Sequence, residues 1–276
     1  MSIHYKNKKY TINTIKKLKN HKKIVALTAF TSYMAELMDP IVDMIIVGDS
    51  VGMVAYGHDS TLMVTIDMII AHGNAVVRGA NKALVVVDMP FGTHEESKEV
   101  AFRNARRIIS ETGADAVKIE VGAETLDTIS FLIARGIPVL PHIGLRPQQI
   151  NVLGGFKTQG KADDEVDKLV KEAKALEKAG AFAVLIEGVY EHAAVEITKS
   201  LQIPSIGIGA SMQCDGQVLV TEDLLGLNKA FKPRFVKQYA DLSRSISDAF
   251  TDYARDVESN QFPTKNHCYL SDPTRC

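Results

Sequence analysis

The sequence predicts a single (β/α)8 TIM barrel, and three observations support this fold class. Short runs rich in Val and Ile alternate with amphipathic helical patterns, which is typical of parallel α/β folds. Eight such runs are present, whereas a doubly wound sheet needs only five or six. The length of 276 residues suits one barrel of ~250 residues. We therefore expect one domain over residues 1–276, with its core at about 20–258 and a C-terminal tail at about 259–276.

The expected strands are nearly continuous apolar runs, as parallel strands covered on both faces should be. The first four lie at Lys23–Thr28, Met44–Gly48, Leu84–Asp88 and Ala116–Glu120, and the last four at Ile137–His142, Ala183–Glu187, Pro204–Ile208 and Val218–Glu222. The segment Leu224–Tyr239 competes with the last of these.

Helices are expected where apolar residues recur at a spacing of three and four. A short one over residues 11–19 precedes the first strand and is expected to close the bottom of the barrel. The others are Ser32–Leu37, Ile66–Arg78, Ser97–Glu111, Leu126–Ala134, Asp164–Ala179, His192–Thr198 and Leu242–Val257. Gly113, Gly136 and Gly180 follow three of them, where a left-handed glycine commonly ends a helix.

Two connections are long for a barrel: Val51–Thr65 after the second strand and Gly144–Ala162 after the fifth. Both follow strands, so we expect them to be long loops on the C-terminal rim, where loops carry ligand contacts.

The composition excludes several classes of partner. A net charge of −1 gives no electrostatic footprint for nucleic acid or for an anionic membrane. Apolar stretches fall far short of the ~20 residues that a spanning helix needs, and the N-terminus does not resemble a signal peptide. The three cysteines are scattered and are expected to be free thiols. The protein is predicted to be cytoplasmic.

Four hydrophobic runs each end in a carboxylate: MIIVGD at Asp49, ALVVVD at Asp88, AVKIE at Glu120 and AVLIE at Glu187. A buried carboxylate is costly to desolvate and needs a partner such as a cation or a proton. Because barrel enzymes build their active sites at the C-terminal ends of strands, these residues predict a convergent acidic site. Oxygen ligands favour Mg²⁺, although Mn²⁺ and Co²⁺ also accept them.

Lys118 and Glu120 are two residues apart on one strand and therefore share a face. With the apolar Val117 and Ile119 facing the helices, this pair faces the lumen, either as a structural ion pair or as a metal ligand beside a substrate-binding cation. Glu187 is read as a general base whose pKa burial would raise, with a helix cap as the alternative. His142 is read as a hydrogen-bonded core residue or a supporting proton carrier.

The segment Gly48–Gly52 matches the G-x-S-x-G nucleophile elbow of serine hydrolases. That motif passes directly from a strand into a helix, whereas the residues after Gly52 have the composition of a loop. Ser50 is therefore expected to bind a substrate carboxylate rather than to act as a nucleophile.

Ten blocks between roughly residues 20 and 245 carry a family resemblance. They are VALTAFTSYMA, VGDSVGMVAYGHDSTLMVT, VVVDMPFGTH, AVKIE, GIPVLPHIGLRPQ, GGFKTQGK, IEGVYEH, IGIGAS, CDGQVLV and FVKQYADL. They resemble the ketopantoate hydroxymethyltransferase (3-methyl-2-oxobutanoate hydroxymethyltransferase) family of pantothenate synthesis. The resemblance implies a one-carbon transferase that moves a hydroxymethyl group from 5,10-methylenetetrahydrofolate to 3-methyl-2-oxobutanoate through a Mg²⁺-stabilised enolate. It also implies a homo-oligomer, a decamer in well-known bacterial members.

Residue roles follow from the same blocks. Asp49, Asp88 and Glu120 match the Mg²⁺ carboxylates of the family, and Glu187 matches its catalytic base. Asp49, Ser50, Asp88 and Lys118 match the positions that bind the keto acid. Two residues depart from the pattern, because Val121 and Pro141 each stand where the family usually has glycine.

Three rival readings stay open. A Mg²⁺-dependent C–C lyase of the isocitrate lyase-like barrels would use a similar enolate, but it often needs a cysteine in a lid, and Cys214 lies in no such motif. A serine hydrolase would use Ser50. A binding protein without activity would be expected to lack a metal carboxylate or the base, and neither is missing.

Overall fold

The computed structural model describes residues 9–122, 125–228 and 233–269. The chain divides into two compact units, Met1–Thr221 and Glu222–Cys276.

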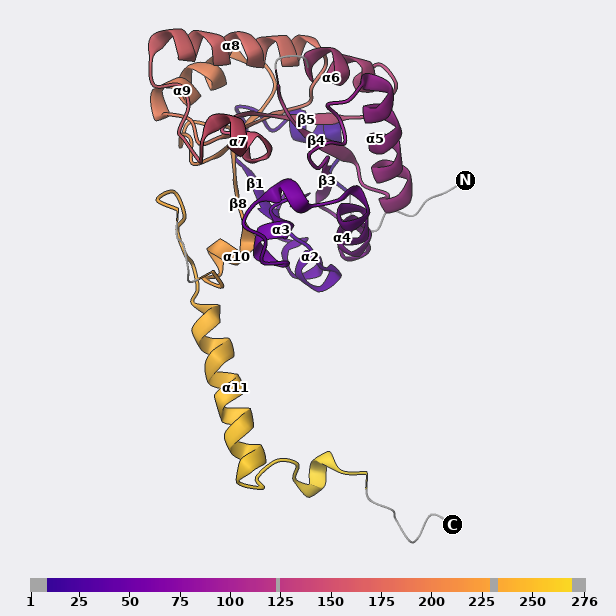
Figure 1. Ribbon diagram of the computed structural model, residues 1–276, viewed down its shortest axis with the longest axis vertical. Helices are drawn as coiled ribbons and strands as arrows, with labels where there is room; N and C mark the ends of the chain where they lie inside the picture. Colours follow the sequence, from indigo (N-terminus) through magenta and orange to yellow (C-terminus); the bar gives the residue numbers. More distant parts are fainter. Residues whose placement is uncertain (1–8, 123–124, 229–232, 270–276) are drawn as a thin grey trace. The chain divides into compact units, whose positions relative to one another are not determined.

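In the first unit, eight parallel strands close into a barrel in sequence order, with β8 hydrogen-bonded to β1 (Figure 1). The predicted (β/α)8 fold is therefore confirmed. The strands are β1 Ile24–Thr28, β2 Met44–Val47, β3 Leu84–Asp88, β4 Ala116–Glu120, β5 Val139–Gly144, β6 Val184–Glu187, β7 Ser205–Ile208 and β8 Gly216–Leu219.

Two strands lie about two residues from their predicted positions. The fifth starts at Val139 rather than Ile137, because the Ile137 backbone N–H donates to Leu132 O and so belongs to the preceding helix end. The eighth starts at Gly216, where a side chain would lie 2.7 Å from Ile24, so glycine permits the close pairing with β1. It ends before Thr221, whose backbone N–H and hydroxyl both donate to Thr28.

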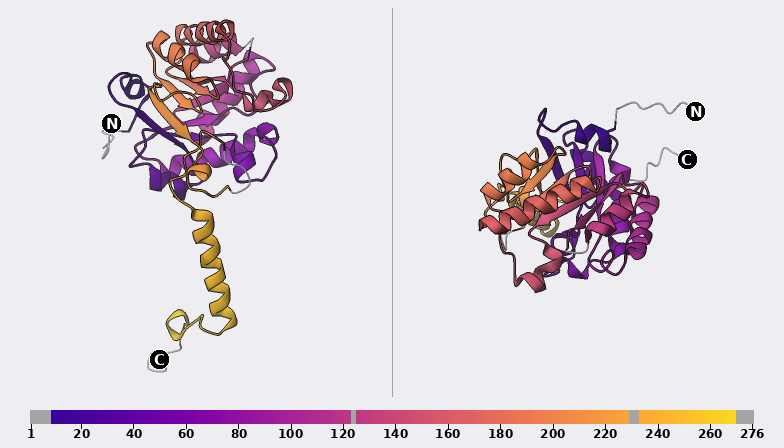
Figure 2. Two further views of the ribbon diagram at one scale, coloured as in Figure 1. Left: turned by 90° about the vertical axis from the view of Figure 1, so that its left-hand side faces the viewer. Right: turned by 90° about the horizontal axis from the view of Figure 1, so that it is seen from above.

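Helices surround the strands of the barrel (Figures 1 and 2). Thr31, Thr65 and Ser97 cap α2 (Ser32–Met38), α4 (Ile66–Gly79) and α5 (Lys98–Thr112) by accepting a backbone N–H with their side chains. Gly113 ends α5 with a φ of 78°, as predicted. The helices are α1 Ile12–Lys16, α2 Ser32–Met38, α3 Val51–Val54, α4 Ile66–Gly79, α5 Lys98–Thr112, α6 Thr125–Ile133, α7 Ile150–Leu153, α8 Asp163–Lys178 and α9 Glu191–Ser200, with 3-10 turns η1 Thr61–Met63 and η2 Pro147–Gln149. The short helix α10 Thr221–Leu224 begins at the last residue of the first unit and continues into the second.

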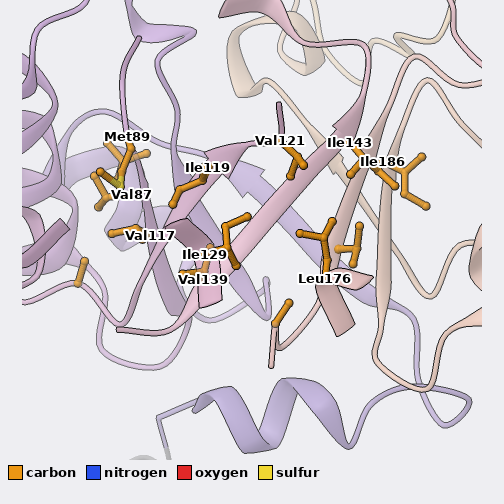
Figure 3. Close-up of a cluster of buried hydrophobic side chains, with 14 of the residues drawn as sticks. Val87, Met89, Val117, Ile119, Val121, Ile129, Val139, Ile143, Leu176 and Ile186 are labelled. Atoms are coloured by element: carbon orange, nitrogen blue, oxygen red, sulfur yellow. The ribbon is translucent and has the colours of Figure 1, made fainter. Parts of the chain in front are cut away.

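Two separate apolar clusters lie on the two faces of the strands. The outer cluster, between strands and helices, contains Val117 and Ile119 of β4 together with Ile129 of α6 (Figure 3). The inner cluster fills the lumen with the alternate residues of the strands, such as Val86 and Leu140. This alternation turns Lys118 and Glu120 toward the lumen, as the sequence predicts.

The helix α1 contributes Ile15, which is fully buried, to the inner cluster beside the start of β1. Tyr10, Ile12 and Leu18 pack against the same cluster. The prediction that a short N-terminal helix closes the bottom of the barrel is confirmed.

The two long connections contain more regular structure than their composition indicates. The first holds α3 and η1, and the second holds η2 and α7. These helical pieces have only three or four residues, which is too short for an apolar period to be recognised. The competing segment Leu224–Tyr239 contains no strand among its described residues.

The second unit contains α11 Leu242–Glu258 and η3 Lys265–His267. The helix α11 has no buried residue, and its apolar residues Ile246, Phe250, Tyr253 and Val257 are 40–69% exposed. Their spacing of four, three and four places them in one stripe. The last part of the expected tail, residues 270–276, lies outside the described residues. Within the described part of the chain, no helix is long and apolar enough to cross a membrane.

Candidate active site

The structure brings the predicted polar residues together at the C-terminal rim. Strand register places Asp88 of β3 beside Lys118 of β4, and Glu120 of β4 beside His142 of β5. Asp49 follows β2 directly, and Glu187 is the last residue of β6. All but Glu187 are more than 90% buried, and the Glu187 side chain is 21% exposed.

Asp88 is the centre of a buried group of charges. Its Oδ2 atom lies 3.0 Å from Lys118 Nζ and accepts the backbone N–H of Asp49 at 2.9 Å. Burial alone would lower the pKa of Lys118, but the charges of Asp88, Asp49 and Glu120 outweigh it, so that this pKa is raised. Lys118 is therefore held as a cation among carboxylates.

His142 lies between two glutamates. Its Nδ1 atom is 3.7 Å from Glu120 Oε1, and its Nε2 atom is 3.4 Å from Glu187 Oε2. Burial, together with the charge of Lys118, holds the pKa of His142 well below its usual range, so the ring is neutral. A neutral imidazole carries one N–H, which it can donate to only one of the two carboxylates at a time.

Glu187 has the protonation behaviour of a base that works near neutrality. Burial is the main cause that raises its pKa from 4.5 to about 7, with a smaller opposing effect of Lys118. Burial also raises the pKa of Glu120. Ionisation of either glutamate is thus disfavoured by the largely apolar lumen.

Ser50 is half-buried beside Gly48, and its side chain makes no hydrogen bond within the described residues. A Cβ atom on Gly48 would lie 2.8 Å from Ser50 Oγ, so glycine keeps this corner open. The expectation of a loop after Gly52 is wrong in part, because α3 begins directly after Ser50. Even so, no hydrogen bond joins Ser50 to a histidine among the described residues, so a hydrolytic triad is not assembled.

The two departures from the family pattern point away from the lumen. Val121 is buried in the outer cluster with Ile143 (Figure 3). Pro141 alternates with Leu140 and His142 along β5 and faces the same outer side, because Leu140 belongs to the inner cluster. Both side chains thus lie on the helix side of the sheet.

Two buried residues at the rim were not predicted as site residues from the sequence. Gln148 in η2 is 4% exposed and donates from Nε2 to Asp49 Oδ2 at 2.8 Å, while its backbone N–H donates to Glu120 Oε2 at 3.1 Å. His94 is 3% exposed, with Nε2 3.3 Å from Glu120 O. A glutamine or histidine in a polar loop gives no pattern in a single sequence. Only the ligand-contact tendency of rim loops could have drawn attention to them.

The carboxylates at the rim are candidate ligands of Mg²⁺. Among the described residues, no three His, Cys, Asp or Glu side chains form a ready-made cage for a metal ion. However, Mg²⁺ is usually held by one or two carboxylates together with waters and substrate oxygens. Asp88 Oδ1 and Glu120 Oε1 are buried without a hydrogen-bond partner, which a cation would supply. The residues present therefore fit Mg²⁺ bound with a chelating substrate.

A cavity of about 560 Å³ adjoins the site and is lined in part by Glu120, Gln148 and His94. Its volume falls in the range of small-molecule pockets. A larger hollow of about 840 Å³ lies beside the residues that precede β1 and β8 and contains none of the candidate site residues. The smaller cavity is therefore the one connected to the chemistry.

Known proteins with similar sequences identify the family of the chain. The family model of ketopantoate hydroxymethyltransferase matches residues 9–265. A 3-methyl-2-oxobutanoate hydroxymethyltransferase of Hahella chejuensis is 55% identical, covering 98% of this chain and 97% of that one. Those of Rhizobium etli and Sinorhizobium medicae are 54% and 52% identical, covering 99% and 98% of this chain and 100% and 98% of their own.

Solved structures share the fold at low identity. A phosphoenolpyruvate phosphomutase from Streptomyces platensis gives a TM-score of 0.61 at 13% identity, covering 94% of this chain and 92% of that one. The structure of 2,3-dimethylmalate lyase, a PEP mutase/isocitrate lyase superfamily member, gives a TM-score of 0.59 at 14% identity, covering 95% of this chain and 90% of that one. A phosphonopyruvate hydrolase in complex with oxalate and Mg++ gives a TM-score of 0.58 at 13% identity, covering 93% of this chain and 93% of that one. On the family model and the close relatives together, the chain belongs to the ketopantoate hydroxymethyltransferase family of transferases.

Proposed function

We propose that this chain transfers a hydroxymethyl group from 5,10-methylenetetrahydrofolate to 3-methyl-2-oxobutanoate, giving ketopantoate through an enolate. The acceptor is the one named for its relatives. The observation that carries the mechanism is Glu187, a carboxylate whose pKa is raised to about 7, on the same barrel rim as the Lys118–Asp88 ion pair. On that rim, Asp88 and Glu120 each have one buried oxygen that accepts no hydrogen bond from the described residues.

Glu187 is the proposed base. Removing the C3 proton of a 2-oxo acid requires a group that is ionised near neutral pH and basic enough to accept the proton. A pKa of about 7 meets both needs. His142, 3.4 Å away, can donate its N–H to the ionised Glu187 and hold it in one orientation.

The acid substrate is proposed to bind between Ser50 and Lys118. The Ser50 hydroxyl makes no hydrogen bond to any residue that the structure describes, and it can donate to a carboxylate. Lys118 is fixed by Asp88 at 3.0 Å, so its charge is already in place when negative charge develops on the keto oxygen. A fixed charge in a water-poor site needs no reorganisation during the reaction.

Asp49, Asp88 and Glu120 are the residues proposed to hold Mg²⁺. When bound, the ion supplies a Lewis acid beside the keto oxygen. This role rests on the two unpaired carboxylate oxygens. It agrees with the oxalate and Mg++ in the phosphonopyruvate hydrolase structure, although that likeness by itself concerns only the fold.

The second candidate function is a Mg²⁺-dependent C–C lyase, favoured by the similarity in fold to 2,3-dimethylmalate lyase. Such lyases often need a cysteine on a lid. Cys214 is fully buried beside Thr198, away from the rim, and the exposed Cys268 is in the second unit. The described residues therefore favour transfer.

The test is NMR of 3-methyl-2-oxobutanoate in D₂O with enzyme and Mg²⁺. Exchange of the C3 proton, with ketopantoate formed only when methylenetetrahydrofolate is present, would support both enolisation and transfer. Exchange without transfer would favour the lyase. Absence of exchange in either condition would remove the mechanism, and labelling of Ser50 by a fluorophosphonate would instead favour a hydrolase.

We also propose that the chain forms a homo-oligomer. An apolar stripe on a helix that buries none of its residues, as on α11, needs another surface to be stable. The outward-facing Val25 of β1 is likewise 42% exposed, where barrels normally carry a covering helix. A second copy of the chain is the proposed partner for these apolar faces.

Sedimentation tests this proposal. The wild-type chain should sediment as a large assembly, of ten chains if the family resemblance holds. Replacing both Phe250 and Tyr253 by Glu should give smaller species, whereas Thr251→Glu, on the polar side of α11, should leave the mass unchanged. A monomeric wild type would contradict the proposal.

A further inference from the structure

Gln148 joins the ends of three neighbouring strands. It lies in η2, shortly after β5, and its side chain is almost fully buried. Its Nε2 atom donates to Asp49 Oδ2 at 2.8 Å and to Met89 O at 3.0 Å, and its backbone N–H donates to Glu120 Oε2 at 3.1 Å. Asp49 lies just after β2, Met89 follows β3, and Glu120 is the last residue of β4.

The three acidic residues share one pattern of hydrogen bonding. Gln148 occupies one oxygen of Asp49 and one oxygen of Glu120. On Asp88, the Oδ2 atom is occupied by the Asp49 backbone N–H and by Lys118. The other oxygens of Asp88 and Glu120, Oδ1 and Oε1, are buried and accept no hydrogen bond from the part of the chain that the structure describes. Each carboxylate thus has one oxygen bound to the protein, and on two of them the second oxygen is demonstrably left over.

This pattern matters for a metal that shares its shell with a substrate. A carboxylate can bind a cation through one oxygen or through both. Mg²⁺ demands an octahedral shell, and a chelating 2-oxo acid needs two of its positions. Carboxylates that used both oxygens would leave too few positions for the substrate. A donor that binds one oxygen fixes the orientation of the carboxylate and leaves its other oxygen facing the metal.

We propose that Gln148 is a positioning residue that orients Asp49 and Glu120 so that each presents one oxygen to Mg²⁺. The inference rests on the proposed function, because it concerns the same metal site. Gln148 touches neither the substrate nor the reacting atoms in this role. It acts only through the two carboxylates that it orients, by its side chain on Asp49 and by its backbone on Glu120.

The test is Gln148→Met, which keeps the size of the side chain and removes its donor. Gln149→Met is the matched control, since Gln149 is the next residue and has no hydrogen bond to the carboxylates among the described residues. Binding of Mn²⁺, used as the probe, is measured by the EPR signal of the free ion, without substrate. Loss of a group that orients a metal ligand typically weakens metal binding about 10–100-fold. We expect that loss for Gln148→Met and less than a twofold change for Gln149→Met.

Kinetics separate positioning from a purely structural role. Gln148→Met should raise the Mg²⁺ concentration needed for half-maximal rate, while kcat at saturating Mg²⁺ stays within a fewfold of wild type. A structural role would lower kcat and leave the Mg²⁺ dependence unchanged, which would overturn the proposal. If Gln148→Met does not fold, Gln148→Asn, whose shorter side chain cannot keep both contacts, is measured in the same way.

The outcomes distinguish this proposal from the proposed function. If the wild-type protein binds no Mn²⁺, the metal site itself is wrong. If the wild type binds Mn²⁺ and Gln148→Met binds it within twofold as tightly, the metal site stands and the role of Gln148 is wrong.

Discussion

Replacing Glu187 by Gln should inactivate the protein and at the same time make it more stable. The folded-state pKa of Glu187 is about 7, against an ordinary value of 4.5. The difference of about 2.5 units corresponds to roughly 3.4 kcal/mol of unfavourable free energy when the carboxylate is ionised. Because a fifth of the side chain is exposed, solvent reduces this cost, and we expect about 2–3 kcal/mol.

The sign of the effect depends on pH. A raised pKa means that the folded state binds the proton more tightly than the unfolded state does, so the native protein loses stability as pH rises from 4.5 to about 7. Glutamine is neutral throughout. The gain in Glu187→Gln should therefore be under about 1 kcal/mol at pH 5 and reach its full size above pH 7.

Calorimetry of the metal-free protein at pH 5 and pH 8 measures this difference. A gain of 2–3 kcal/mol corresponds to a rise of roughly 4–10 °C in melting temperature for a chain of this size. Glu196→Gln is the control, because Glu196 is an exposed residue of α9 and should change little at either pH. An unchanged melting temperature for Glu187→Gln at pH 8, or an equal gain at both pH values, would refute the explanation that burial of the Glu187 carboxylate destabilises its ionised form.

The catalytic part of the same prediction uses the D₂O exchange assay. Loss of a general base typically costs about 10²–10⁴-fold in rate, while Mg²⁺ and keto-acid binding should persist in Glu187→Gln. In the wild type, kcat/KM should fall as pH decreases below about 7, because the base becomes protonated. Full turnover by the variant would show that another group removes the proton.

Three further predictions concern stability. Lys118→Met should lower the free energy of unfolding by about 3–5 kcal/mol, because Asp88 is left buried without its cation. Adding Asp88→Asn should restore most of this stability. If urea unfolding gives the single variant wild-type stability, the ion pair does not stabilise the fold. Gly144→Ala should cost about 2 kcal/mol or more, since its φ is +92° and a Cβ would clash with the backbone oxygen of Glu187. Gly57→Ala, at φ +70° in open space, should cost only about 1–2 kcal/mol. Equal losses of stability for the two variants would show that the clash at Gly144 has no effect. Ile15→Ala should cost about 2–5 kcal/mol with kcat unchanged, as it lies at the opposite end of the barrel; a large fall in kcat for the folded variant would contradict that separation.

Much of the barrel and part of the site were predictable, because they depend on local patterns. The period of two along β4 separates Val117 and Ile119 from Lys118 and Glu120 without knowledge of any neighbour. Likewise, a carboxylate at the end of an apolar run identifies Asp88 and the rim together. These signals lie within a few residues of the chain.

Other features depend on contacts between distant segments. His142 lies between Glu120 and Glu187 only because of the register of β4, β5 and β6, which a single sequence does not reveal. Gln148 contacts Asp49 across 99 positions of the chain. The helix α3 is only four residues long, and its stability depends on its surroundings rather than on its own propensity.

The closure of the barrel by α1 has a consequence for the order of events in catalysis. Since Ile15 and the inner cluster fill the far end, entrance and exit are the same opening at the rim. Under the proposed reaction, two substrates and two products all pass through it. The keto acid, bound deepest against Lys118, must arrive before the bulkier folate covers it and leave after the folate has departed. The architecture thus favours an ordered mechanism, in which the keto acid binds first and its product is released last.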